Sequence, residues 1–162
     1  PGSGVDTSEE YNGASWTSGG ALPAAKYHFG SSGTQTAGLA FGGSEDKWTT
    51  TEEYNGASWT AGGAMIKGAK GLGASTSGTQ TDSIGFRGRN PNPTAITNTE
   101  GYDGTSWSTR PSVATAKQYI GGAGTSTAAL KVGGGPSPAT YTGVEEFTGE
   151  TSAATASTLT TS

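Results

Sequence analysis

Residues 51–60 read TEEYNGASWT and residues 8–17 read SEEYNGASWT, so nine of ten letters return in the same order. The phrase recurs in altered form at 99–108, TEGYDGTSWS, and without its tryptophan at 144–149, VEEFTG. The aromatic anchors are spaced 43, 48 and 45 residues apart, at Tyr11, Tyr54, Tyr102 and Phe147. A period of this size is typical of repeat architectures, in which each unit is too small to bury a core alone.

The composition favours an all-β chain. Only 30% of the residues are hydrophobic, which can accompany disorder, but disordered chains are poor in aromatic residues and here they recur on schedule. The 29 glycines and the many β-branched residues both weaken helix interiors. We therefore expect short strands joined by turns.

Charge and cysteine content narrow the expected partners and cofactors. The formal net charge is −4 and the basic residues do not cluster, so we expect neither a nucleic-acid nor an anionic-membrane partner. No apolar run is long enough to span a bilayer. The absence of cysteine excludes disulfides, thiolate metal sites and a thiol nucleophile. We predict no metal and no cofactor.

One unit, residues 25–60, divides into four expected strands. These are 25–31, 37–41, 50–54 and 57–60, with a turn at 33–36 and a two-residue hairpin turn at Asn55-Gly56. The same order predicts a blade over 69–108, with its first strand at 69–74, and a blade over 116–154, with outer strands at 116–121 and about 150–153. Residues 7–17 supply only the outer two strands of another blade. The prediction is thus a single repeat domain, 1–162, of about three and a half propeller blades, each a four-stranded antiparallel sheet.

The pattern resembles the kelch family of β-propellers. The resemblance rests on the di-glycines Gly42-Gly43 and Gly133-Gly134, then a tyrosine (Tyr54, Tyr102), then a tryptophan five residues later (Trp59, Trp107). The second unit departs from it with Arg87-Gly88, and the last has Phe147 and no tryptophan. More narrowly, GTQTAGLAFGG, TEEYNGASWT and the terminal EEFTGET…TLTTS look like kelch-like repeat proteins of bacteriophages and environmental viral sequences. That resemblance implies a structural protein of a virion or the extracellular space, and not an enzyme.

Three sets of recurring residues have structural interpretations. The aromatic residues are expected to fill the space between neighbouring sheets; they are Tyr11, Trp16, Tyr54, Trp59, Tyr102, Trp107 and Phe147. A glutamate lies two residues before each anchor, on the same strand face; the set is Glu9, Glu52, Glu100 and Glu145. A lysine opens each first strand, at Lys26, Lys70 and Lys117. We predict that a glutamate of the second set pairs with a lysine of the third, within or between blades.

A candidate ligand site lies on the more variable loops. Loops at one end of the blades repeat closely, whereas SEDKWT (44–49), GRNPNPTAI (88–96) and GPSPATY (135–141) differ in length and type, as recognition loops do. A sugar would stack on Trp48 and bind polar groups around it; the predicted set is Trp48, Asp46, Arg87, Arg89, Asn90, Asn92 and Tyr141. The alternative is that Trp48 covers a blade edge.

Catalytic interpretations find little support, and we predict no catalytic residue. The only histidine, His28, falls in an expected first strand, where packing is the simpler role. A copper oxidase of kelch-like fold would need a Cys–Tyr cofactor and two histidines. A sialidase-like box would place aspartate where Tyr11, Tyr54 and Tyr102 stand.

The unit count predicts an incomplete ring, because propellers close with about four to eight blades. Upstream residues, a second copy, or the C-terminal segment 155–162 (TASTLTTS) acting as a closing strand would each complete it. We expect self-association or association with other structural subunits. Two functions remain: a structural protein of a virion or extracellular fibre assembled through blade-to-blade contacts, or a propeller that binds a glycan or receptor through its variable loops.

Overall fold

A computed structural model gives the fold and describes residues 4–43, 48–89, 96–135, 142–149 and 155–157. All the regular elements in these ranges are strands, and they form four antiparallel sheets. The first sheet, here called the half blade, pairs β1 (Glu9–Tyr11) with β2 (Trp16–Ser18). Within the described ranges, no helix has the length and apolarity needed to cross a membrane.

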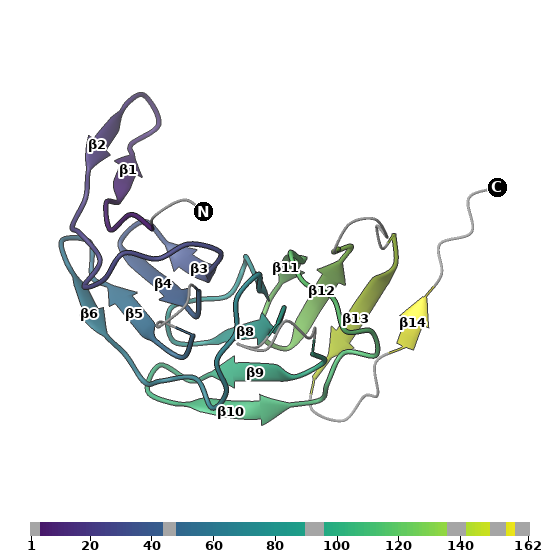
Figure 1. The fold of residues 1–162 in the computed structure, drawn as a ribbon. Coiled ribbons are helices and arrows are strands. Elements are labelled where there is room, and N and C mark those ends of the chain that lie inside the picture. Colours follow the sequence, from purple (N-terminus) through teal and green to yellow (C-terminus); the bar gives the residue numbers. More distant parts are fainter. Residues whose placement is uncertain (1–3, 44–47, 90–95, 136–141, 150–154, 158–162) are drawn as a thin grey trace.

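Three four-stranded sheets follow, and each is built in chain order. Blade 1 consists of β3 (Gly30–Thr34), β4 (Ala37–Phe41), β5 (Thr51–Tyr54) and β6 (Trp59–Ala61). Blade 2 consists of β7 (Gly73–Ala74), β8 (Ser83–Phe86), β9 (Thr99–Tyr102) and β10 (Trp107–Arg110). Blade 3 consists of β11 (Gly121–Gly124), β12 (Ala128–Val132), β13 (Val144–Thr148) and β14 (Thr155–Ser157). The all-β prediction of three blades and a half blade is confirmed, and the sheets form an open arc with β1 and β14 at opposite ends (Figure 1).

The first strand of each blade begins later than expected. Strands predicted at 25–31, 69–74 and 116–121 begin at Gly30, Gly73 and Gly121. The residues before them bond to neighbouring blades: Gly71 N donates to His28 O (2.8 Å), and Tyr119 N donates to Gly71 O (2.9 Å). His28 and Tyr119 both have a φ of 56°, so this segment leaves the extended conformation, and the expected strand position of His28 is wrong.

The outer hairpin turn is wider than a two-residue Asn-Gly turn. Tyr54 pairs with Trp59, which leaves the four residues 55–58 in the turn. Asn55 Oδ1 accepts hydrogen bonds from Ala57 N (3.0 Å) and Ser58 N (2.9 Å), and Gly56 has a φ of +87°. The asparagine side chain thus supplies acceptors that stabilise the longer turn. The inner turn is tighter than the expected 33–36, because Thr34 pairs with Ala37 and leaves two residues between the strands.

Part of the C-terminal segment belongs to blade 3. β14 pairs with β13, with Ser157 opposite Val144, so Thr155–Ser157 is the fourth strand of this blade. The fourth strand predicted at 150–153 lies outside the described residues. The pairing of β14 corrects the assignment of 155–162 as a closing strand, because its first three residues are used in their own blade.

The buried apolar residues gather between the sheets. One cluster joins blades 1 and 2 and contains Leu39, Phe41, Met65, Ala69, Leu72, Ala74, Tyr102 and Trp107. The other joins blades 2 and 3 and contains Ile84, Phe86, Val113, Ala129 and Phe147. Burying one such large side chain contributes about 1.5–3 kcal/mol, so each blade is stabilised by its neighbour, as the repeat period indicates.

Candidate functional site: the faces that join the blades

The junction between blades 1 and 2 shows the repeating contact in full. Tyr102 Oη donates a hydrogen bond to Glu53 Oε1 (2.5 Å), and Trp107 Nε1 donates to Thr51 Oγ1 (2.9 Å). The ring centroid of Trp107 lies 4.8 Å from that of Phe41. A tyrosine and a tryptophan of one blade therefore dock on β4 and β5 of the preceding blade.

The junction between the half blade and blade 1 repeats the polar contacts. Tyr54 Oη donates to Glu10, and Trp59 Nε1 donates to Ser8 Oγ (3.4 Å). Glu10 and Ser8 occupy the positions of Glu53 and Thr51 in the repeated phrase. The half blade has no counterpart of β4 in the described residues, and Trp59 is half-buried, whereas Trp107 is buried.

Both tyrosines are held in the neutral form. Burial first, and then the hydrogen bond to Glu53, raises the pKa of Tyr102 to about 12. The hydrogen bond to Glu10 is the main cause that raises the pKa of Tyr54. Each phenol remains a proton donor at neutral pH.

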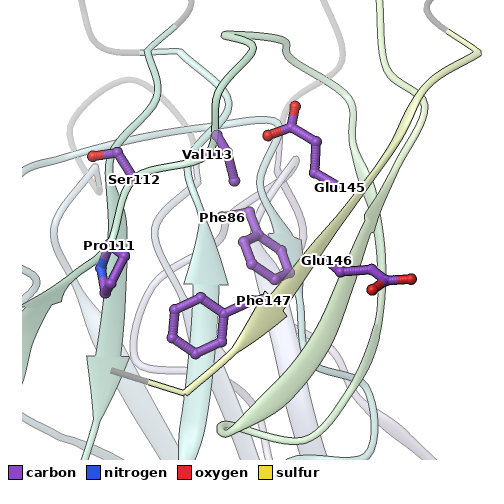
Figure 2. A pocket seen from close by; sticks show the side chains of 7 residues that line it. All are labelled: Phe86, Pro111, Ser112, Val113, Glu145, Glu146 and Phe147. Carbon is purple, nitrogen blue, oxygen red and sulfur yellow. The ribbon is translucent and has the colours of Figure 1, made fainter. Parts of the chain in front are cut away.

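The junction between blades 2 and 3 has lost both halves of this pair together. Gly101 stands where the other blades carry Glu10 and Glu53, and Phe147 stands where they carry a tyrosine. The rings of Phe86 and Phe147 lie together beside Val113 and line a small cavity of about 10 Å³ (Figure 2). An apolar contact stands where the other two junctions have a tyrosine–carboxylate pair.

The two ends of the arc expose the unpaired halves of the same contact. Tyr11 is 48% exposed and Trp16 is 65% exposed, and Tyr11 Oη donates to Gly13 O (2.8 Å) in its own turn. At the other end, Glu146 occupies the position of Glu53 and is exposed on the side of β13 away from Phe86 (Figure 2). Leu130, the counterpart of the buried Leu39, is 37% exposed beside it. These two surfaces are the half-blade end and the blade 3 end.

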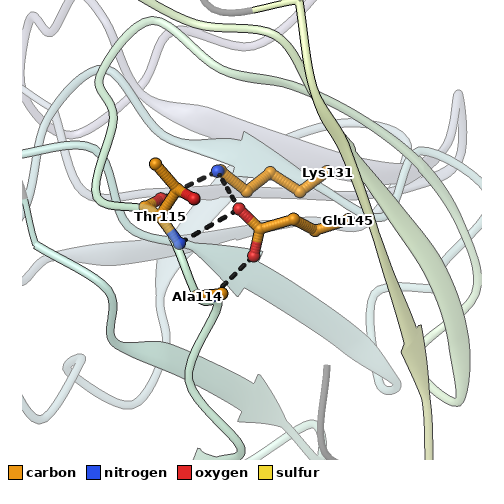
Figure 3. Close-up of polar contacts among 4 residues, drawn as sticks. All are labelled: Ala114, Thr115, Lys131 and Glu145. Atoms are coloured by element: carbon orange, nitrogen blue, oxygen red, sulfur yellow. Dashed lines mark hydrogen bonds and ion pairs between the residues drawn. The ribbon is translucent and has the colours of Figure 1, made fainter. Parts of the chain in front are cut away.

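The glutamate two residues before the anchor is also buried in blades 2 and 3. There it binds the crossover segment that leads into its own blade. Glu145 accepts from Ala114 N (2.5 Å) and Thr115 N (3.1 Å), while Lys131 Nζ bridges Glu145 Oε1 (2.8 Å) and Thr115 O (2.8 Å) (Figure 3). In blade 2, Glu100 accepts from the amides of Ile66 (3.0 Å) and Lys67 (3.2 Å). The glutamate of each of these blades therefore fixes the incoming chain.

The predicted glutamate–lysine pair is present in blade 1. Lys26 pairs with Glu52, as the prediction required. In the other two blades the cation comes from the second strand or the residue after it: Arg87 Nη1 lies 3.7 Å from Glu100 Oε1, and Lys131 pairs with Glu145. Lys70 instead holds its ammonium over the Trp48 ring (5.0 Å). The signal that could have found this cation is strand register, because Lys131 in β12 lies directly opposite Glu145 in the adjacent strand β13.

The two buried glutamates, Glu145 and Glu100, have pKa values shifted in opposite directions. Burial pushes the pKa of Glu145 up, but the hydrogen bonds from Lys131, Ala114 and Thr115 outweigh it and bring the pKa below its ordinary value. Burial dominates at Glu100 and raises its pKa despite the attraction of Arg87. Burial also lowers the pKa of Arg87.

The structure describes three of the predicted sugar-site residues, namely Trp48, Arg87 and Arg89. Arg87 is 1% exposed and bonds to Gly68 O and Glu100, which makes it part of the core and not of a ligand site. Arg89 exchanges two backbone hydrogen bonds of 3.0 Å with Lys70, so it lies near Trp48. Asp46, Asn90, Asn92 and Tyr141 lie outside the described residues. The glycine at 68 leaves room for Trp48, because a Cβ there would collide with the Trp48 side chain.

The other repeat residues fall into buried, exposed and half-buried positions. Tyr54, Tyr102, Trp107 and Phe147 are buried, whereas Tyr11, Trp16 and Glu9 are exposed on the half blade. Lys117 is half-buried.

Comparison with protein-family models gives no match, and comparison with curated protein sequences gives none either.

Proposed function

We propose that this chain is a non-enzymatic structural protein of a virion or an extracellular fibre, assembled through blade-to-blade contacts. The observation that carries the proposal is the pair of exposed ends. One end presents a tyrosine and a tryptophan, and the other presents a glutamate and a leucine in the positions that bind those rings inside the arc. The location in a virion or fibre rests on the resemblance of the repeat to kelch-like phage proteins.

Docking of the half-blade end of one copy on the blade 3 end of the next would repeat the internal junction. Tyr11 Oη would donate to Glu146 as Tyr102 donates to Glu53. Because the two surfaces differ, the contact is head-to-tail, and it produces a ring or a filament according to the angle between copies.

The test is the mass of the chain in solution across a range of concentrations. We expect species heavier than the 16.0 kDa monomer that grow with concentration. Leu130→Asp should abolish them, whereas Ile66→Asp, at a residue 52% exposed on a crossover, should not. A wild-type chain that stays at the monomer mass up to about 1 mM, where even an association with a Kd of about 1 mM would be detected, would overturn the proposal.

The second candidate function is glycan binding at the variable loops. The contact of the Trp48 ring with Lys70, close to Arg89, is the observation that favours it. A glycan array probed with the wild type and with Trp48→Ala separates the structural function from glycan binding. Loss of glycan binding in Trp48→Ala, with the mass of the assembly in solution unchanged, supports recognition.

A further inference from the structure

One buried cation in blade 2 has no carboxylate beside it. The buried cationic side chains of the described chain are Lys26, Lys70, Arg87 and Lys131. All of them except Lys70 lie beside a glutamate. Lys70 is 8% exposed, and its ammonium lies over the rings of Trp48 (5.0 Å) and Tyr27 (5.9 Å) without an ion pair to any described residue. Because buried charges are normally paired with an opposite charge, the place of the carboxylate at Lys70 is open to one from a ligand.

Arg89 adds a second cation on the same side of the chain. Lys70 and Arg89 form a β-bridge and exchange two backbone hydrogen bonds of 3.0 Å, so their side chains lie on one face. The Nε atom of Arg89 is buried and has no hydrogen-bond partner. Like charges directly opposite each other destabilise a strand pair, and the equivalent bridge in blade 3, Gln118 with Gly135, is uncharged. The fold therefore does not need the two cations, and an anion between them would relieve their repulsion.

Exposed aromatic rings lie next to the two cations. Gly71, which follows Lys70, donates from its N to His28 O (2.8 Å) and accepts from Tyr119 N (2.9 Å). The rings of His28 and Tyr119 meet edge to face, with centroids 5.2 Å apart, and Tyr27 continues the row at 5.0 Å from His28. His28 is exposed and Tyr119 is 52% exposed. Exposed aromatic surface of this kind is available for stacking against the apolar face of a sugar ring.

The backbone beneath these rings is strained, although the repeat offers an unstrained alternative. His28 and Tyr119 both have a φ of 56°, in the left-handed region that residues other than glycine rarely adopt. Gly71 holds the same place in blade 2, two residues before the first strand, and has a φ of 65°. Strained residues are concentrated at ligand sites, where the position of the side chain matters more than its cost in stability. The strain thus marks the two rings as a functional surface.

We propose that Lys70 and Arg89 bind the carboxylate of an acidic sugar, whose ring and neighbouring sugar units lie on His28 and Tyr119. The guanidinium of Arg89 donates to a carboxylate as a planar fork, and the ammonium of Lys70 supplies the second positive charge. The inference rests on glycan binding, the second candidate function, and names the class of sugar. It does not depend on assembly of the chain.

The test uses the full chain and a trisaccharide of galacturonic acid, with isothermal titration calorimetry as the measurement. We expect a Kd of about 1 mM or below, and weaker binding as the ionic strength rises. The methyl ester of the same trisaccharide has no charge and should bind at least about tenfold more weakly. Acetate has the carboxylate but no sugar ring, and it should also bind at least about tenfold more weakly.

Variants of the two cations test the charged half of the site. Lys70→Met keeps an apolar side chain against Trp48 and Tyr27 and should weaken binding at least about tenfold. Arg89→Gln should have an effect of the same size, and because Arg89 is only half-buried this result does not depend on the folding of Lys70→Met. The matched control is Lys67→Met, at an exposed lysine on the crossover before blade 2, which should change the Kd by less than about twofold.

A variant of the exposed ring and a stability measurement separate a ligand site from a structural one. Tyr119→Asn suits the left-handed backbone and should weaken binding at least about threefold, because the stacking surface is lost. Without ligand, Lys70→Met should unfold at the same denaturant concentration as the wild type or a higher one, because it removes a buried charge without a counter-charge. The trisaccharide should stabilise the wild type and not Lys70→Met.

Several results would overturn the inference. They are no binding of the trisaccharide, equal binding of its methyl ester or of acetate, unchanged binding in Arg89→Gln, or equal losses in Lys67→Met and Lys70→Met. If neutral sugars bind in a manner that depends on Trp48 while the acidic trisaccharide does not bind, glycan recognition stands and only this inference is refuted. Binding of the trisaccharide by a chain that stays monomeric would support the inference while the assembly proposal fails.

Discussion

The half blade and blade 1 carry almost the same ten residues in two different environments. Tyr11 and Trp16 pair across their hairpin as Tyr54 and Trp59 do, and the ring centroids are 5.0 Å apart in both. Yet Tyr11 is 48% exposed, while Tyr54 is 5% exposed. The phrase itself therefore determines the hairpin and its ring pair, and the neighbouring blade determines whether the rings are buried.

The largest expected effect compares the two tryptophans in their two environments. Trp107→Ala removes a buried ring from the junction of blades 1 and 2 and should lower the free energy of unfolding by about 3–5 kcal/mol. Trp16→Ala, at an exposed ring, should change it by less than about 0.5 kcal/mol. Denaturant unfolding of the two variants is the measurement, and similar losses would contradict the comparison.

The next effect compares the buried and exposed glutamates. Glu145→Gln leaves Lys131 buried without its counter-charge and should cost about 3 kcal/mol at pH 7, whereas Glu9→Gln should be nearly neutral. Since the folded pKa of Glu145 lies below its ordinary value of 4.5, its stabilisation is present above pH 4.5 and is lost as the pH falls through the folded value. The difference in unfolding free energy between wild type and variant should therefore stay constant down to about pH 4.5 and shrink at lower pH. A difference that grows on acidification would contradict the lowered pKa of Glu145.

A smaller effect is expected for the tyrosine hydroxyls. Tyr102→Phe removes a hydrogen bond to a carboxylate and should cost about 1.5 kcal/mol. Tyr11→Phe should cost almost nothing, because its hydroxyl donates only to Gly13 O in an exposed turn. A double-mutant cycle with Glu53→Gln measures the coupling energy of the pair directly. A coupling energy of zero would show that the Tyr102–Glu53 contact does not contribute to stability.

The smallest effect is expected where the pair is already lost. Gly101→Glu alone should change the stability little, because its side chain meets only the mobile end of Arg110, whose guanidinium attracts a carboxylate. Phe147→Tyr alone should destabilise, because it places a hydroxyl in an apolar junction. Combined, the two should show a favourable coupling of about 0.5 kcal/mol. Simple additivity of the two single effects would indicate that this junction cannot accept the polar contact.

The sequence predicts most of the sheet order, because the repeat, the turn residues and the alternation of strands are local signals. The second and third strands of blade 1 were placed almost to the residue, at Ala37–Phe41 and Thr51–Tyr54. The first strands were placed too early, because the segment around His28 bonds to other blades, and no local pattern reports such contacts.

The junction chemistry was only partly predictable. The recurring glutamate was recognised, but its cation comes from three different positions, Lys26, Arg87 and Lys131, so a search at one fixed spacing finds only the first. The tyrosine–glutamate pair left a readable signal in the sequence, since glutamate and tyrosine disappear together at Gly101 and Phe147. Reading that signal requires knowing that these two positions belong to adjacent blades.

The apolar junction between blades 2 and 3 also gives the array a fixed order. Exchanging whole units by recombination would set Phe147 against a blade that carries glutamate, or a tyrosine against Gly101, and either would leave a polar group in that junction without its counterpart. If residues 51–98 were duplicated, each tyrosine would again face a blade that carries glutamate. Such a duplication is therefore compatible with the chemistry of the junctions, whereas moving the last unit is not.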